Sequence, residues 1–415
     1  MAPPPPPPPS AAVAPPPDAD APAADADARL GQRWVVQWCL DGWHDAREAV
    51  AEMLGAEDYH VRPLDPQGPP LAEQCRGAHV LVPTTGRVDA ACIAAALPSL
   101  ALIAQPASAT GNIDLAAAKQ RGVPVTHAPG HNAAATAEIA VMLLLMLLRR
   151  PLEAPAAIAA REVGRPVGRE ARGRTLGVVG VTGRVGRRVA RAAAALGMRV
   201  IGIDSKGARS ELRPVGDDDD GDDVDEEEDD DDGSGGRGDQ GRRQQRPSSA
   251  PRAVVAPSAA PSSDLDLSPF KRGLHALLEE SDAVSLHIPL SAETEGAIGR
   301  DELSIMARRG ALLVNTARAA VVDRAALEEA LGPPADDGGG GGDGSRPRLR
   351  GAALDVMWEE PCDPADPLLR HPSCVVLPHL GCASEEAYLA LAGVLVRNIR
   401  AAREGRWADL EHRVV

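Results

Sequence analysis

The chain has 415 residues, of which 44% are hydrophobic, and a formal net charge of −16 at pH 7, so it is long enough for two domains with sizeable cores. Fourteen carboxylates lie between residues 217 and 232, which leaves a net charge of only about −2 for the rest of the chain. This distribution argues against a nucleic-acid partner and against a basic membrane-binding patch. The longest apolar run, residues 139–148, is followed by two arginines and is too short to cross a bilayer.

The Pro/Ala-rich residues 1–32 are interpreted as a disordered leader. After them, short apolar runs alternate with stretches of helical spacing up to about Gly130. This alternation predicts a parallel sheet with helices on both faces. Strands are expected at Trp34–Leu40, Ala78–Pro83 and Leu100–Ala104, and helices at Asp45–Leu54 and Asp89–Leu97.

A long helix, Ala133–Arg150, precedes a glycine-containing run, Thr175–Gly186, in which Gly180, Gly183 and Gly186 are spaced Gly-x-x-Gly-x-x-Gly. A helix over residues 187–196 and a strand ending at Asp204 follow. This order is typical of a dinucleotide-binding unit, with a purely structural turn as the alternative. Glycines let the backbone approach a pyrophosphate at the helix N-terminus, and a carboxylate can accept the adenine-ribose hydroxyls.

The composition then changes. Residues 207–263 and 333–347 are too poor in apolar side chains to build a core, and both are predicted to be disordered insertions. The acidic block in the first could recruit a basic partner, although a solvating tract is favoured. Regular elements are expected between and after the insertions. The predicted strand is Ala283–Ile288, and the predicted helices are Leu274–Leu278, Arg300–Ala307, Val322–Leu331 and Glu385–Glu404.

Three polar side chains follow three further apolar runs: Arg318 after 310–317, Glu360 after 351–356, and His379 after 374–378. We expect them at the tips of buried parallel strands along one edge, which is where open sheets bind ligands. An arginine that grips a carboxylate, a histidine that moves a proton and a carboxylate that supports that histidine are suited to interconverting 2-hydroxy and 2-oxo acids. Each residue alone would more often be a surface charge or a structural histidine.

The six cysteines lack Cys-x-x-Cys spacing, and a chain of this size does not need disulfides. Reduced thiols in the cytoplasm are the expectation, with organelle targeting as the alternative. A zinc site is disfavoured and no metal is expected, because structural zinc ligands pair two to four residues apart on a turn, whereas several of these positions alternate with apolar residues. The residues considered for zinc were Cys362, His371, Cys374, His379 and Cys382.

In several stretches the chain resembles the D-isomer-specific 2-hydroxyacid dehydrogenases, which include glyoxylate and hydroxypyruvate reductases. The matching stretches run in family order and cover the chain from about Trp34 to its end, apart from the two insertions. They are Asn112–Leu115, Arg121–Gly130, Val284–Thr294, Leu313–Arg318 with Val322-Asp323, Ala353–Val356, Glu360-Pro361 and Pro378–Gly381.

The resemblance implies an α/β fold of two Rossmann-like, doubly wound parallel-sheet domains. A discontinuous substrate domain, residues 33–131 and 379–415, would flank an NAD-binding domain, residues 132–378. It further implies a homodimer formed through the NAD domain and a small 2-oxo or D-2-hydroxy acid as substrate. Asp204 favours NAD over NADP, since a carboxylate would repel a 2′-phosphate.

The resemblance also implies roles for individual residues. Arg318 would bind the substrate carboxylate, His379 would act as the acid in reduction and the base in oxidation, and Glu360 would hold the imidazole tautomer. Ser108 and Ala109 would join Arg318 in substrate binding. The positions that match cofactor contacts are Gly180, Gly183, Arg184, Val185, Gly186, Asp204, Pro289, Thr316, Ala317, Asp355 and Gly381.

Three positions depart from the family pattern. Val181 stands where the second glycine of Gly-x-Gly-x-x-Gly is usual, Ala107-Ser108-Ala109 replaces a Gly-x-Gly loop, and Ala319 follows Arg318 in place of glycine. The alternative function is therefore a catalytically weak NAD-sensing scaffold, like the transcriptional corepressors related to this family. The intact Arg318, Glu360 and His379 favour the enzyme.

Overall fold

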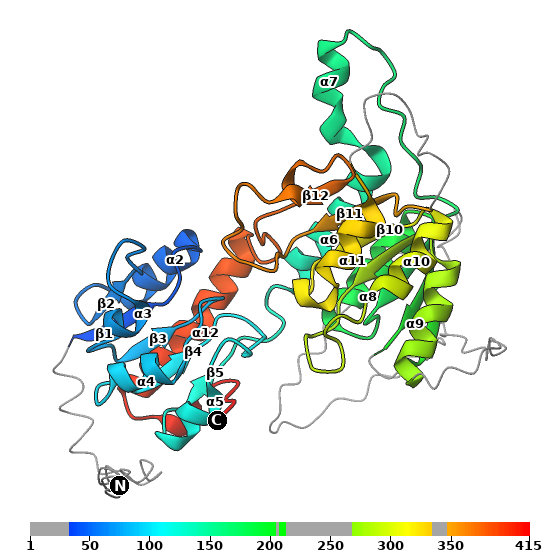
Figure 1. The fold of residues 1–415 in the computed structure, drawn as a ribbon. Helices are drawn as coiled ribbons and strands as arrows, with labels where there is room; N and C mark the ends of the chain where they lie inside the picture. The colour runs from blue at the N-terminus through cyan, green and yellow to red at the C-terminus, as the bar shows by residue number, and fades with distance from the viewer. Residues whose placement is uncertain (1–32, 205–206, 213–267, 334–346) are drawn as a thin grey trace, which may run out of the picture.

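The computed structural model describes residues 33–204, 207–212, 268–333 and 347–415. The predicted leader and nearly all of both predicted insertions lie outside these residues. Two sheets, the first entirely parallel and the second parallel except for one edge strand, dominate the described part of the chain, as Figure 1 shows. The predicted fold class, α/β with Rossmann-like parallel sheets, is confirmed.

The first sheet has the strand order β2-β1-β3-β4-β5, and all its pairings are parallel. Alternate strand residues enter different cores. Val80 and Val82 pack with α2 and α12, whereas Leu81 packs with the elements on the other face. The elements are β1 (Trp34–Trp38), α2 (His44–Leu54), β2 (Tyr59–Arg62), α3 (Leu71–Gln74), β3 (Val80–Val82), α4 (Ala90–Ala96), β4 (Leu102–Ala104), α5 (Leu115–Gln120), β5 (Val125–Thr126) and α12 (Glu385–Arg403).

The second sheet has the order β12-β11-β10-β9-β6-β7-β8. One core lies between the sheet and α6 and α8, and the other between the sheet and α9, α10 and α11. The elements are α6 (Ala133–Arg149), β6 (Thr175–Val179), α8 (Arg184–Ala195), β7 (Arg199–Ile203), β8 (Arg209–Leu212), α9 (Pro269–Glu280), β9 (Ala283–Leu286), α10 (Arg300–Arg309), β10 (Leu312–Asn315), α11 (Arg324–Leu331), β11 (Gly351–Leu354) and β12 (Cys374–Val376). Two short pieces, η1 (Pro151–Glu153) and α7 (Ala154–Ala159), project from this body (Figure 1).

The last long helix, α12, returns to the first sheet. Leu395, Val396 and Ile399 of α12 share a core with Trp34 and Val36 of β1, and in Figure 1 α12 lies against the first sheet. This is the packing that a discontinuous substrate domain requires, although the proposed boundaries at residues 131 and 378 stay a prediction.

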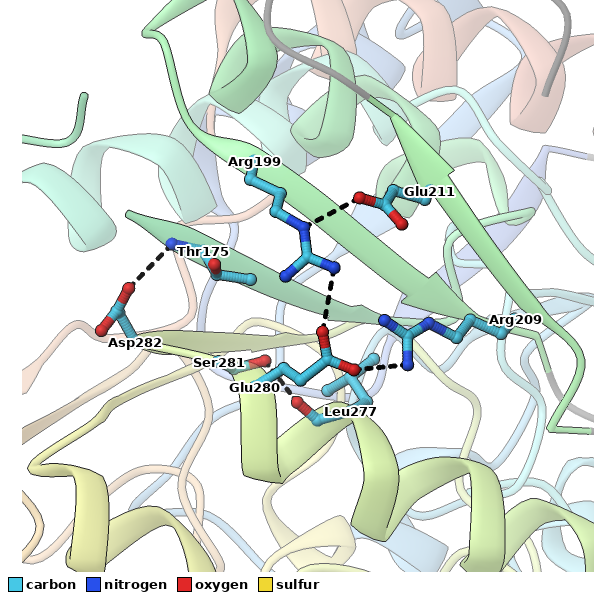
Figure 2. A network of polar contacts seen from close by, with 8 residues as sticks. All are labelled: Thr175, Arg199, Arg209, Glu211, Leu277, Glu280, Ser281 and Asp282. Carbon is cyan, nitrogen blue, oxygen red and sulfur yellow. Dashed lines mark hydrogen bonds and ion pairs between the residues drawn. The ribbon is translucent and has the colours of Figure 1, made fainter. Parts of the chain in front are cut away.

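One sequence-based boundary is wrong. The first insertion was expected to begin at residue 207, but Arg209–Leu212 form β8, which pairs antiparallel with β7. Polar contacts hold this edge strand in place (Figure 2). Arg199 of β7 donates to Glu211 of β8 at 2.8 Å and to Glu280 of α9 at 2.9 Å, and Arg209 donates to Glu280 at 2.6 Å.

Glu280→Ala is expected to lower the free energy of unfolding by about 1 kcal/mol, since it removes the carboxylate that two half-exposed arginines share. Hydrogen bonds from Arg209 and Arg199 lower the pKa of Glu280 despite its partial burial, so its contribution is present at neutral pH and is lost as pH falls through the lowered pKa. Thermal melts of wild type and Glu280→Ala at pH 7 and pH 4 measure this loss of stability, and Glu279→Ala, at an exposed neighbouring position, is the control. Equal melting temperatures for the two variants at pH 7 would contradict it.

Candidate active site

Arg318 follows β10 and is held by a short turn. The Asn315 side chain accepts a hydrogen bond from the Ala317 amide at 3.0 Å and donates one to the Arg318 carbonyl at 3.0 Å. The guanidinium donates to the Ala317 carbonyl at 2.6 Å. Burial lowers the pKa of Arg318, and the nearby negative charge of Glu360 opposes that change. A largely buried cation beside a carboxylate is a site at which an anionic ligand gains strong interactions.

His379 and Glu360 form a direct pair. His379 Nδ1 lies 2.8 Å from Glu360 Oε2, and the two side chains are 22% and 27% exposed. Glu360 Oε1 accepts a hydrogen bond from the Met357 amide at 3.1 Å. Burial raises the pKa of Glu360, but the hydrogen bond and charge of His379, with Arg318 beyond, outweigh it and lower that pKa overall. The carboxylate is therefore ionised at neutral pH and fixes the imidazole orientation.

Hydrogen bonds to Asp355 and Thr136 hold the turn that carries His379. The Leu380 and Gly381 amides donate to the buried Asp355 carboxylate at 2.7 and 2.8 Å, and Thr136 donates to the Gly381 carbonyl at 2.6 Å. A Cβ at residue 381 would lie 2.9 Å from Asp355 Oδ2, so this glycine permits the close approach. The structure thus gives Asp355 a part in holding the His379 turn, which is additional to its predicted cofactor contact.

The glycine turn fits a dinucleotide phosphate. A Cβ at Gly180 would lie 2.5 Å from the His287 carbonyl oxygen, and one at Gly186 would lie 2.2 Å from the Gly180 carbonyl oxygen. α8 begins at Arg184, and its N-cap, Gly183, provides no side-chain cap. The first amides of this helix are therefore oriented to meet an anion, as the sequence predicts.

The remaining predicted cofactor positions lie at the ends of neighbouring strands. Asp204 follows β7, and its Oδ1 accepts a hydrogen bond from the Ala208 amide at 2.9 Å. Pro289 follows β9, whereas Thr316 and Ala317 follow β10. Arg184 extends its guanidinium to the Pro129 carbonyl at 2.9 Å, and Val185 follows it in the first turn of α8.

The predicted substrate loop packs against the segment that joins the two sheets. The Ser108 hydroxyl accepts a hydrogen bond from the Gly130 amide at 3.2 Å, and the Ser108 carbonyl oxygen lies 2.9 Å from His127 Nδ1. Gln105 donates to the Ala109 carbonyl at 2.8 Å and to Asn112 at 3.0 Å. These bonds fix the loop that replaces the family's Gly-x-Gly.

Two residues near the site carried no predicted role. His287 is partly buried and lies 2.8 Å from Ser285 Oγ and 3.4 Å from Thr316 Oγ1; desolvation lowers its pKa to about 3, so it is neutral. The Trp43 ring meets the His379 ring edge-on with centroids 6.4 Å apart. His287 lies in one of the stretches that resemble the family, but Trp43 lies between β1 and α2, and no local pattern links it to His379.

Within the described residues no group of three potential ligands is arranged to hold a metal ion. Of the residues considered for zinc, His371 has both ring nitrogens engaged, by the Gly332 carbonyl at 3.0 Å and the Ser373 amide at 3.1 Å. Burial raises the pKa of the Cys374 and Cys382 thiols to about 12, so both are protonated at neutral pH. In the same part of the chain, no helix is long and apolar enough to span a bilayer.

Comparison with known proteins gives consistent matches. A curated glyoxylate reductase of Aeropyrum pernix is 32% identical over 376 residues, which cover 87% of this chain and 92% of that protein. A D-3-phosphoglycerate dehydrogenase of Archaeoglobus fulgidus is 30% identical, over 77% of this chain but 48% of its own length. The solved structure of the TT0316 protein from Thermus thermophilus matches with a TM-score of 0.64 and 31% identity, over 92% of this chain and all of that one.

Residues 141–226 and 233–381 match the NAD-binding domain of the D-isomer specific 2-hydroxyacid dehydrogenases. This match contains the glycine turn and the Arg318, Glu360 and His379 cluster, and it covers more than half of the chain. Together with the relatives that align over most of their length, it establishes that the chain belongs to the D-isomer specific 2-hydroxyacid dehydrogenase family.

Proposed function

We propose that the protein is an NAD-dependent reductase of a small 2-oxo acid, glyoxylate or hydroxypyruvate, that also runs in reverse on the D-2-hydroxy acid. The observation that carries this proposal is the His379–Glu360 pair with Arg318 beside it. These residues lie at the carboxyl edge of the sheet whose glycine turn suits a dinucleotide.

Each side chain has a role that follows from its contacts. When held at the turn of Gly180, Gly183 and Gly186, reduced NAD would supply a hydride to C2 of the acid. Arg318 binds the carboxylate and polarises the oxo group, because its buried guanidinium attracts developing negative charge. Glu360 accepts a hydrogen bond from Nδ1–H of protonated His379, which leaves Nε2–H to donate its proton to the C2 oxygen. In oxidation, Nε2 accepts that proton.

Two further features of the proposal concern the cofactor and the assembly. Asp204 follows β7 and supports NAD over NADP, since its charge would repel a 2′-phosphate. An apolar groove of about 620 Å³ lies between α6, η1 and α8, with Met142 and Leu145 in its lining and Glu138 and Arg188 among its charged residues. It supports a homodimer formed through the NAD domain, and light scattering of the purified protein tests this.

The test of the function is turnover. Purified protein is mixed with NADH or NADPH and a panel of 2-oxo acids, and the absorbance of the reduced cofactor is followed at each acid concentration. We expect turnover with glyoxylate or hydroxypyruvate and a higher kcat/KM with NADH. Thermal stabilisation by NAD without turnover of any acid would refute the enzyme and favour the scaffold alternative.

A further inference from the structure

Trp43 brings the first sheet into contact with the candidate catalytic histidine. It lies between β1 and α2, and its ring is 6.4 Å from that of His379 at an interplanar angle of 72°. The same indole lies 6.4 Å from the ring of Tyr388, in the first turn of α12, at 32°. Because His379 belongs to the edge of the second sheet, the first sheet supplies an aromatic wall beside it.

The backbone of Trp43 holds this wall in a fixed place. Its φ and ψ of 53° and 46° are in the left-handed region, which is costly for a bulky residue and persists only where the surroundings impose it. Its carbonyl accepts the first hydrogen bond of α2, from the Arg47 amide at 3.0 Å. The indole also packs against the core that α2, α12 and the first sheet share.

The groups around C2 leave one direction for the substrate side chain. If Arg318 takes the carboxylate, His379 the C2 oxygen and the dinucleotide one face of C2, the remaining substituent, the substrate side chain, extends toward the first sheet. On the side of the first sheet, the Trp43 ring lies 6.4 Å from the His379 ring. We propose, on the basis of the proposed function, that Trp43 is a specificity-determining residue that restricts the substrate to 2-oxo acids with a small, uncharged side chain.

The chemistry of this wall disfavours an anionic substituent. An indole offers an apolar face and a single N–H donor, so burying a phosphate against it leaves most phosphate oxygens without partners. The relatives are named for two substrates, glyoxylate and 3-phosphoglycerate. The aromatic wall therefore favours glyoxylate and disfavours a phosphorylated acid.

The experiment compares wild type, Trp43→Phe and Trp43→Ala with glyoxylate, hydroxypyruvate, 2-oxo-4-methylpentanoate and 3-phosphohydroxypyruvate. Trp43→Ala is expected to raise kcat/KM for the branched acid relative to glyoxylate by about tenfold or more, since it opens space for several methylene groups. Trp43→Phe should change the ratio less, which keeps the test valid if the alanine variant folds poorly. Wild type should prefer hydroxypyruvate over its phosphorylated form.

Trp407→Ala is the matched control. It also removes an indole, but one beyond the C-terminal end of α12, roughly 20 Å along that helix from Tyr388, and the substrate ratio should not move. If wild type is active on glyoxylate but neither Trp43 variant changes the kcat/KM ratio of the branched acid to glyoxylate, the specificity role of Trp43 is overturned and the proposed function stands. Wild type without turnover overturns the proposed function and this inference with it.

Discussion

His379→Ala is expected to lower kcat by two to four orders of magnitude, the range typical for removal of a positioned acid or base. In the proposed mechanism this ring donates the proton, with Glu360 Oε2 2.8 Å from its Nδ1, and alanine leaves no group to protonate the C2 oxygen. Binding of NADH should be retained, because the glycine turn lies on other strands. Steady-state kinetics with glyoxylate and fluorescence titration of NADH measure the two effects.

Two variants make this result specific. Glu360→Gln keeps the size of the partner but removes its charge, and it should lower kcat less than His379→Ala while leaving KM nearly unchanged. His60→Ala, at an exposed position of β2, removes a histidine remote from the site and should be neutral. A His379→Ala enzyme with wild-type kcat would rule out proton transfer by this residue.

The sequence predicted the strands that matter for the site because their signals are local. Buried parallel strands are short continuous apolar runs, and the runs before Arg318, Glu360 and His379 became the adjacent strands β10, β11 and β12. The glycine turn also has a local signal. Gly186 approaches the Gly180 carbonyl so closely that a residue with a Cβ would not fit there, so the glycine spacing itself predicts the turn. The helix α8 nevertheless begins three residues earlier than expected, at Arg184, since Gly183 already serves as its N-cap.

Features that depend on tertiary contacts were not predicted. β8 has the polar sequence Arg-Ser-Glu-Leu, and ion pairs of Arg209 and Glu211 connect it to β7 and α9. Trp43 gives no local signal of its contact with His379, which depends on how the first sheet lies against the second. Asp355 was assigned to the cofactor from the family pattern, and only coordinates reveal its two bonds to the His379 turn.

Arg318→Lys is expected to lower kcat/KM for the 2-oxo acid by about two orders of magnitude. Lysine keeps the positive charge but lacks the planar fork that binds a carboxylate through two parallel hydrogen bonds. The shorter head group would also lose the bond to the Ala317 carbonyl that orients Arg318. Because the proposal gives one group both the carboxylate and the oxo oxygen, both KM and kcat should worsen, whereas NADH affinity should not.

Arg309→Lys provides the comparison. Arg309 is a half-exposed arginine at the end of α10 that donates to the Ser281 carbonyl at 3.2 Å, so lysine there should leave both constants near wild type. Arg318→Met, which removes the charge but keeps an unbranched stem, should lose more than Arg318→Lys, because the loss then includes the attraction between the guanidinium and the acid. Equal losses for lysine and methionine would assign the whole effect to hydrogen-bond geometry, and wild-type kinetics in both would remove Arg318 from the site.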